Sequence, residues 1–442
     1  MLKIACFCLA FAAMPLLAQV APSASGGGYD LDSEHMMTPP PVSREGYPVD
    51  AGSEGRSNFI AGGLVFTAAA TDNLMLFGGG DKSPDQTFAF LPTIELDRRT
   101  PRDGETLSYS TGYTLYNHYS QLNAVTQNGS GTYRLHLTPY AVIRMSDSFL
   151  QNYNTYNQGN PFAGGGVSGA PGSSDTPLIE PYANQLSNSS NAGFEYQYAK
   201  NAMIGAGGSY SFLNFSGNSY IPQLSDQNTT GGNGFFSRRF GRSYAGVTYQ
   251  FSKFVTHPYG SYTIANTVFG FYTHYFSRTI SISVLGGPEH YTSWTEVKPK
   301  SSAWTPAVQG SVGWQVARAN LAANYSHVVS GAGGLIGTFH SDTGSLSCLY
   351  MFTRKWSASA HAEYSHFVNI NSNAVDLSVY AGGDSISGGV DVQRRFTERL
   401  SMEAGYLHLH QSYPGVVATG TLEDSNRGYV SIMYQFNRPL GR

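Results

Sequence analysis

From about residue 59 to the C-terminus, apolar and polar side chains alternate with a period of two, which is the pattern of β-strands. Between Trp356 and Tyr364, the even positions read Trp, Ala, Ala, Ala, Tyr, and the odd positions read Ser, Ser, His, Glu. Many alternating stretches exceed about ten residues, whereas strands in globular proteins usually have about five or six. The pattern predicts an all-β fold built from unusually long strands.

We expect eighteen strands, of which the one at 231–239 has the weakest pattern, so that sixteen is the alternative count. Their predicted ranges are 60–70, 86–97, 105–118, 129–138, 140–151, 188–199, 201–215, 231–239, 242–254, 265–276, 279–292, 303–317, 319–330, 339–353, 356–369, 384–397, 399–413 and 426–437. Short turns alternate with longer connections rich in Gly, Asn, Ser and Pro, the longest at 152–187. Short turns at one rim and long loops at the other are typical of a closed antiparallel transmembrane β-barrel, and an even strand count places both termini on the periplasmic side.

The composition agrees with such a barrel. Only 12% of the residues are charged, 55 are Tyr or Phe (30 and 25), and the mean hydropathy is −0.24. A polar lumen combined with an apolar exterior gives this mixture. After the N-terminal segment, no stretch approaches the roughly 18 apolar residues of a membrane-spanning helix. A soluble β-sandwich, propeller or solenoid is the alternative, but it explains neither the long strands nor the outward faces, which are almost free of charge.

The N-terminus carries a different pattern. Residues 1–18 read as a signal peptide, with Lys3 before an apolar core and cleavage near Ala18. Cleavage would remove Cys6 and Cys8 and leave Cys348, which rules out a disulfide framework and a cysteine metal cluster. Residues 19–58 are rich in Gly and Pro and predict a flexible periplasmic leader, and residues 59–442 form the predicted barrel.

Several short stretches resemble the β-barrel porins of Gram-negative outer membranes. They are Asp72-Asn73-Leu74, Leu91-Pro92-Thr93-Ile94, Leu107-Ser108-Tyr109, Tyr244 to Phe254, and Gly286-Gly287-Pro288-Glu289. The resemblance implies a porin-like barrel in contact with outer-membrane lipid, and it fixes no substrate. The alternating end with Tyr434 and Phe436 resembles the signal that the barrel-assembly machinery reads, although residues 437–442 follow it.

An eighteen-stranded barrel leaves an aqueous interior unless something fills it, so we expect a channel for small hydrophilic solutes. Charged and polar residues on the predicted inward faces are the candidate pore lining: Arg134, His136, Arg144, Glu195, His274, His361, Glu363, Asp391 and Glu403. A basic ladder of Arg134, His136 and Arg144 could face an acidic patch of Glu363, Asp391 and Glu403 and so create a transverse field. The alternative is that these groups are solvated or paired and have no role in selectivity.

Other features leave the substrate open. Saccharides could stack on Tyr116, Tyr244 and Tyr272, although interfacial girdles also explain abundant tyrosine. The 152–187 connection could fold inward as a constriction or remain an external loop. Small inward residues suggest space for water: Gly205, Gly207, Ser209, Ser211, Ser281, Ser283, Ser357 and Ser359.

Three other functions compete with the channel. One is an outer-membrane component for polysaccharide export or secretion, and another is a purely structural barrel. The third is a transporter of hydrophobic solutes with an internal hatch, which requires an apolar N-terminal plug that the polar leader does not predict.

No catalytic, metal or cofactor site is expected. His408 and His410 share one strand face but lack a third metal ligand. Asp72, Ser108 and His118 contain the residue types of a hydrolase, but no nucleophile motif accompanies them. The net charge of −3 gives no footprint for nucleic acid, and the oligomeric state, a homo-oligomer included, stays open.

Overall fold

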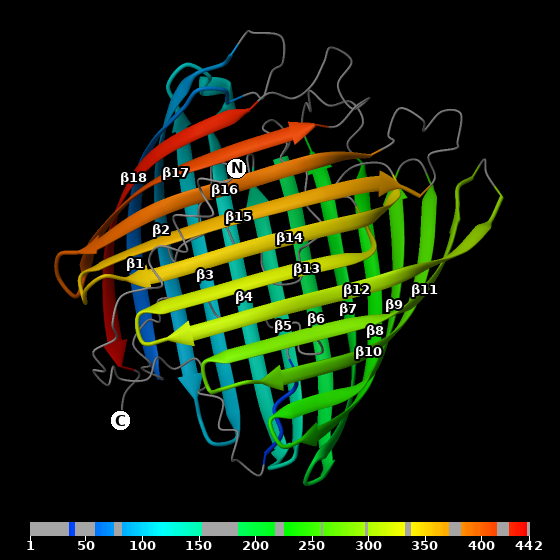
Figure 1. The fold of residues 1–442 in the computed structure, drawn as a ribbon. Helices are drawn as coiled ribbons and strands as arrows, with labels where there is room; N and C mark the ends of the chain where they lie inside the picture. Colours follow the sequence, from blue (N-terminus) through cyan, green and yellow to red (C-terminus); the bar gives the residue numbers. More distant parts are fainter. Residues whose placement is uncertain are drawn as a thin grey trace.

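The computed structural model describes residues 35–39, 58–74, 82–152, 184–216, 225–257, 260–296, 299–331, 337–370, 382–412 and 424–439. Eighteen antiparallel strands form one sheet (Figure 1). The strands are β1 (Phe59–Thr71), β2 (Asp85–Arg99), β3 (Asp103–Tyr116), β4 (Ala124–Thr138), β5 (Ala141–Asn152), β6 (Asn184–Ala199), β7 (Ala202–Ser216), β8 (Asp226–Phe240), β9 (Ser243–His257), β10 (Ser261–Tyr275), β11 (Ile280–Trp294), β12 (Ser301–Val316), β13 (Ala319–Gly331), β14 (Thr338–Met351), β15 (Trp356–Asn369), β16 (Gly382–Arg395), β17 (Leu400–Ser412) and β18 (Ser425–Pro439).

The sheet closes on itself, because β1 pairs with β2 on one side and with β18 on the other. Leu64 faces Pro92 of β2 and Tyr434 of β18 in these two ladders. Closure satisfies the backbone groups of every strand edge, which a lipid environment requires because it offers no hydrogen bonds. The predicted closed antiparallel barrel and its count of eighteen are confirmed, and the stretch with the weakest pattern forms the full-length strand β8.

Short turns lie at one rim and longer connections at the other. The turns at 139–140, 200–201, 241–242 and 317–318 join strands directly, and β1 begins and β18 ends at this same rim. Most of the predicted 152–187 connection, residues 153–183, lies outside the described residues, and β6 already begins at Asn184. A single 3-10 turn, Ser120–Leu122, is the helical element of the described ranges, and none of their helical segments has the length and hydropathy to cross a bilayer.

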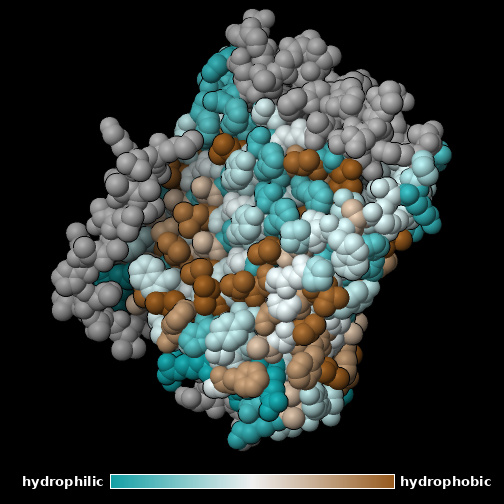
Figure 2. All heavy atoms as spheres, turned by 45° about the vertical axis from the view of Figure 1, so that its right-hand side comes forward, coloured by the Kyte–Doolittle hydropathy of each residue, from teal (hydrophilic) through white to brown (hydrophobic). Residues whose placement is uncertain are grey.

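The outer face of the wall is apolar. Large side chains point outward from strand after strand and are about half exposed, among them Phe66, Phe90, Ile94, Val390 and Ile432. Figure 2 shows brown and pale side chains gathered across the middle of one outer face, with hydrophilic teal at its lower edge. Exposed apolar surface of this extent is unfavourable in water. Soluble monomers therefore rarely expose apolar patches of more than a few hundred square ångströms.

Aromatic residues border this apolar band at two levels. At the short-turn rim, Tyr198, Phe240, Phe276, Phe352 and Trp356 are exposed. Toward the long-loop rim, outward tyrosines donate their hydroxyls to polar side chains of the next strand: Tyr249 to Asn266, Tyr325 to Asp342, Tyr364 to Asp384 and Tyr406 to Asn426.

The spacing of the two levels fits a membrane. On β15, eight residues separate Trp356 from Tyr364. Eight steps cover about 26 Å along a strand, or about 20 Å along the normal for a tilt of roughly 40°. Transmembrane barrels carry an apolar band about 25 Å tall between two aromatic girdles. The exterior therefore has the chemistry and the height of a surface in contact with lipid.

Candidate pore interior

The register of the strands defines which residues face the lumen. Basic side chains gather on β4 and β5, where Arg134 and Arg144 are directly opposite each other across the ladder. Arg144 Nε lies 3.3 Å from Glu195 Oε2 on β6, so one carboxylate partly neutralises this pair. His136 is on the same face as Arg134, one inward position closer to the short-turn rim, opposite Val142. Four of the predicted pore residues therefore lie together on neighbouring strands: Arg134, His136, Arg144 and Glu195.

Acidic side chains gather on β16 and β17. Asp391 is opposite Gly405, which places it diagonally across from Glu403. The Tyr429 hydroxyl donates to Glu403 Oε1 at 2.8 Å, and the Ser359 hydroxyl donates to Asp391 Oδ1. Both carboxylates are buried in the wall, at 7% and 6% exposure, rather than extended into the lumen.

Two other predicted pore residues stand farther along β15. His361 is opposite Gly389 and its ring lies over that glycine, while Glu363 is opposite Ser387. Ser387 is four residues from Asp391 on β16, or about 13 Å along the strand. Glu363 thus shares the face of Asp391 and Glu403 but not their level.

The basic and acidic groups occupy separate walls at a similar height. Arg144 on β5 and Glu403 on β17 are six strands apart in the ring of eighteen, which is a third of the way round. Arg144 is three residues from the start of β5, and Glu403 is three residues from the start of β17. Each charge therefore lies about 10 Å along its strand from the short-turn rim. A solute passing this level would meet a guanidinium side and a carboxylate side.

The prediction for His274 is wrong, because this residue lies on the outer face. It is two positions from the exposed Tyr272 (50%) and two from the exposed Phe276 (57%), and residues two positions apart on a strand share a face. Its ring lies parallel to Tyr272 at 6.2 Å and edge-on to Phe276 at 4.6 Å, and its Nδ1 is 2.8 Å from Ser243 Oγ. An imidazole has an apolar body and a polar tip, so it fits the aromatic girdle, where one end is apolar and the other wet.

The tyrosines proposed as sugar platforms are not open to the lumen. Tyr272 faces outward. Tyr116 is buried against Leu74 and Leu122, and Tyr244 is 2% exposed with its ring edge against Tyr275. Tyr275, although it stands beside a short turn, also points inward and is buried in the inner cluster. None of these positions supports a preference for saccharides.

The small inward residues were expected to leave room for water, and two of them instead make room for other side chains. A Cβ at Gly205 would lie 2.3 Å from the ring of Phe235, and a Cβ at Gly207 would lie 2.7 Å from Asn233 Oδ1. Ser283 is fully buried and pairs with Thr273 at 2.5 Å. The two glycines of β7 therefore let larger neighbours lie flat on the wall.

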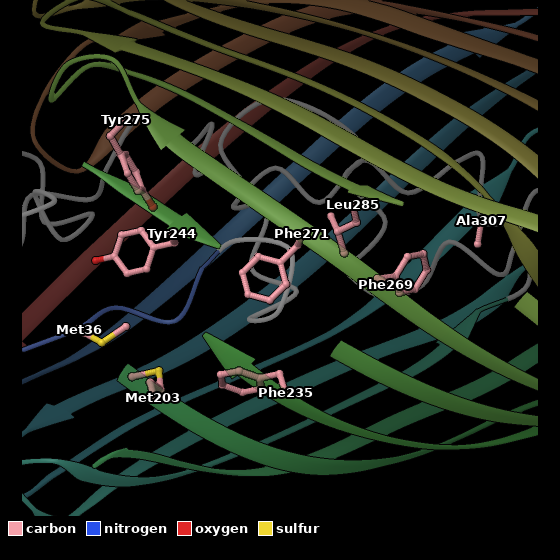
Figure 3. Packing of buried hydrophobic residues seen from close by; sticks show 9 residues of the cluster. All are labelled: Met36, Met203, Phe235, Tyr244, Phe269, Phe271, Tyr275, Leu285 and Ala307. Atoms are coloured by element: carbon pink, nitrogen blue, oxygen red, sulfur yellow. The ribbon is translucent and has the colours of Figure 1, made fainter. Parts of the chain in front are cut away.

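An apolar cluster inside the barrel was not predicted. It contains inward residues of β7 to β12 and Met36 from the N-terminal segment: Met36, Met203, Phe235, Tyr244, Phe269, Phe271, Tyr275, Leu285 and Ala307. Figure 3 shows these side chains on the inner face, where Met36 lies on a separate, non-strand segment of the chain near Met203 and Tyr244. The odd positions of β10 and the pair Met36-Met37 carry the sequence signal for it, but nothing local links the two.

The segment His35–Pro39 therefore lies at the mouth of the barrel, where the sequence predicted a flexible periplasmic leader. The backbone N–H of Met36 donates to Gln197 Oε1 at 2.7 Å, and Gln197 in turn donates to the Lys200 carbonyl. The ring of His35 lies 5.2 Å from that of Tyr140 in the β4–β5 turn. These contacts hold the segment at the short-turn rim.

No metal or hydrolase constellation forms within the described residues. His408 Nδ1 and His410 Nδ1 face outward and pair separately with Asn426 and Asp424, at 2.9 and 2.5 Å. Groups of three or more metal-ligating side chains are absent from the described part of the chain. Of the supposed hydrolase residues, Ser108 pairs with Ser130, and His118 pairs with Asp85.

Comparison with known proteins adds the following. Neither the family models nor the curated proteins contain a match to this sequence. Among solved structures, OccK2 (OpdF) of Pseudomonas aeruginosa is 9% identical, with 87% of this chain and 100% of that chain covered and a TM-score of 0.42. OccK9 (OpdG) of Pseudomonas aeruginosa is 11% identical, with 89% and 100% covered and a TM-score of 0.42.

The ferric citrate transporter FecA is 15% identical, with 87% of this chain and 67% of that chain covered and a TM-score of 0.41. Similarity at this level carries no argument about family or function. The case for a function therefore rests on the geometry of this barrel.

Proposed function

We propose that the protein is an outer-membrane channel through which small hydrophilic solutes diffuse. The observation that carries the proposal is a closed ring of eighteen strands whose outer face is exposed, apolar and bordered by aromatic residues. Barrels of 16–18 strands enclose an aqueous passage when nothing fills them. Charged groups of both signs on the inner wall give that passage its polar surface.

The charged walls suggest weak ion selectivity rather than a strong preference. Arg134 and Arg144 lie near the carboxylate of Glu195 on one wall, and Asp391 and Glu403 lie on another. Opposed charges orient a dipolar solute across the passage, whereas their sum changes the average potential little. The proposed substrates are therefore small polar or zwitterionic molecules.

The test is reconstitution of the purified protein in a planar lipid bilayer. Stepwise conductance with a measurable reversal potential in a salt gradient is the expected result. A correctly folded barrel, recognised by its heat-modifiable migration in gels, that produced no conductance steps would overturn the channel. A protein that stayed monodisperse in buffer without detergent would overturn the membrane location itself.

A further inference from the structure

The wall of the barrel separates between two neighbouring strands on the long-loop side. The ladder between β12 and β13 ends at the pair Val308–His327, although β12 extends beyond that pair to Ser301 and β13 extends beyond it to Gly331. β12 remains paired with β11 as far as Ser301, and β13 remains paired with β14 as far as Gly331. The separation therefore lies between two strands that each keep their other neighbour.

A proline lies where the ladder stops. The same register, continued, would place Pro306 of β12 opposite Val329 of β13, and proline has no N–H to donate to a ladder. The β11–β12 ladder runs on through the pair Pro288–Pro306, so the interruption lies on the side that faces β13. A carboxylate accepts the Val329 N–H instead: Glu289 of β11, which is 3% exposed, accepts it at 3.0 Å.

Next to this hydrogen bond, the outward side of β13 lies against the inward side of β9 and β10. Val329 shares a strand face with the outward Tyr325, which is 49% exposed. Val329 is nevertheless 5% exposed and packs against Phe254 and Ala265. These two residues share the inward faces of β9 and β10 with members of the inner apolar cluster. The end of β13 is therefore inside the wall that β9 and β10 form.

β14 takes part in the same contact. The Thr338 hydroxyl donates to the Thr263 hydroxyl of β10 at 2.8 Å, and both side chains are buried. The ring of His340 lies 5.4 Å from the ring of Tyr291 on β11. In the ring of strands, β14 is four positions from β10, which is about 19 Å along a continuous wall. The wall therefore overlaps itself here, and we call the contact of β13 and β14 with β9 to β11 the wall overlap.

The wall overlap can open at low cost. It shortens the circumference of the wall and so narrows the lumen at the long-loop rim. Side-chain contacts and the hydrogen bond from Val329 to Glu289 hold it, rather than a strand ladder. Outward movement of β13 would bring residues 328–331 beside residues 301–307 of β12. Strand edges in lipid need hydrogen-bonding partners, and each of these two edges would supply partners for the other.

We propose that the wall overlap is a gate at the long-loop mouth of the channel. In the closed state, which the structure shows, the ends of β13 and β14 lie inside β9 to β11, and Glu289 holds them through the Val329 N–H. In the open state they lie beside β12, and the lumen regains its full circumference. This inference rests on the proposed channel, and it makes Glu289 a positioning residue.

The first experiment locks the overlap in the full barrel. Thr263→Cys and Thr338→Cys are combined in a Cys348→Ser background, because groups 2.8 Å apart can reach the roughly 2.05 Å of a disulfide bond with small rotations. The matched control is Thr67→Cys with Ser431→Cys, a hydroxyl pair also 2.8 Å apart, on the adjacent strands β1 and β18. Oxidation is expected to consume both thiols of each pair. Oxidation of the control pair alone would overturn the overlap.

The locked barrel is then measured in a planar lipid bilayer. The oxidised overlap pair is expected to show a smaller conductance than the parent, and reduction with dithiothreitol is expected to restore steps of the parental size. The control pair should conduct equally in both redox states, because its disulfide joins strands that are already paired. Equal conductance of the overlap pair before and after reduction would overturn the gate.

A second measurement follows the opening without conduction. Val329→Cys, again with Cys348→Ser, is expected to react with a polar maleimide when the overlap opens. In folded barrel in detergent, Glu289→Ala is expected to raise the labelling rate roughly tenfold, the factor expected for loss of one hydrogen bond to a charged acceptor. Glu289→Gln keeps an acceptor oxygen for the backbone N–H and should label at close to the parental rate. Glu105→Ala, which removes an acid paired with Arg98 at 3.2 Å, is the control and should match the parent.

The labelling experiment separates this inference from the channel function, because it does not depend on conduction. Equal labelling rates in Glu289→Ala and Glu105→Ala would refute the role of Glu289. Faster labelling in Glu289→Ala with a silent bilayer would overturn only the channel. A conducting bilayer, with neither labelling nor conductance changed by these variants, would overturn only the gate.

Discussion

Replacement of Gly246 by alanine tests how the inner wall is built. Gly246 faces the lumen on β9, directly opposite Phe271 of β10 and beside Phe236 of β8. A Cβ at this position would lie 2.0 Å from the carbonyl oxygen of Phe236, and 2.6 and 2.8 Å from two ring atoms of Phe271. The ring can rotate away, but the carbonyl belongs to the β8–β9 ladder and cannot move without loss of a hydrogen bond.

Overpacking of a well-packed site costs about 1–3 kcal/mol, and the fixed backbone oxygen places this substitution near the upper end. A cost of about 3 kcal/mol corresponds to a roughly 150-fold change in the unfolding equilibrium. Urea unfolding in detergent or lipid vesicles, followed by gel migration and tryptophan fluorescence, would measure it. Phe271 should also be displaced from its flat position over residue 246.

Gly270→Ala is the matched control on the neighbouring strand. Gly270 faces outward, and the nearest atom to its added Cβ is the Gly286 carbonyl oxygen at 3.9 Å, an ordinary contact. This substitution should be neutral or stabilising by about 0.4–1 kcal/mol, because alanine restricts the unfolded chain. Equal stabilities of the Gly246 and Gly270 variants would refute the assignment of inner and outer faces on these strands.

Four further predictions concern the charges and the loop. Replacing both acids, Asp391→Asn with Glu403→Gln, should shift the reversal potential of the channel toward anions; an unmoved potential at unchanged conductance would exclude these acids from selectivity. Glu195→Gln removes the carboxylate beside Arg144 and should raise the anion-to-cation permeability ratio roughly threefold, as expected for one charge at about 6 Å in water. Arg144→Gln removes a positive charge and should lower the same ratio. At the long-loop rim, burial alone would raise the pKa of Asp72, but hydrogen bonds from the Asn426 side chain and backbone, together with Lys82, outweigh it and hold the pKa below its usual value. The resulting stability is present above the ordinary carboxyl pKa and is lost as the pH falls through the lowered one, so Asp72→Asn should be less stable than the parent at neutral pH and should approach it in acid; a difference that persisted in acid would contradict this account. If residues 152–187 narrow the passage, deletion of 158–176 should raise the single-channel conductance, and an unchanged conductance would reject the constriction.

The candidate site was partly predictable. Arg134, Arg144 and Glu195 could be placed on one face because each belongs to a strand whose opposite face is clearly apolar. His274 could not, since β10 carries aromatic residues on both faces, with Tyr272 outside and Phe271 inside. Where both faces are equally apolar, alternation still predicts a strand but no longer indicates which side meets lipid.

The sequence by itself determined the strands and the closed barrel, and favoured eighteen strands over sixteen, because alternation with a period of two is a local property that each strand carries without reference to any other. It also predicted the contrast between short turns and long connections, and with it the rim where the first strand begins and the last strand ends.

Only the tertiary structure decided which residues share a level. The height of Arg144 relative to Glu403 depends on the register summed over the six strand pairings between β17 and β5, and no single strand contains that information. The docking of Met36 against Phe235 and Tyr244 joins parts of the chain about two hundred residues apart. Such contacts form because the closed wall brings distant strands to face a common interior, which a local pattern does not encode.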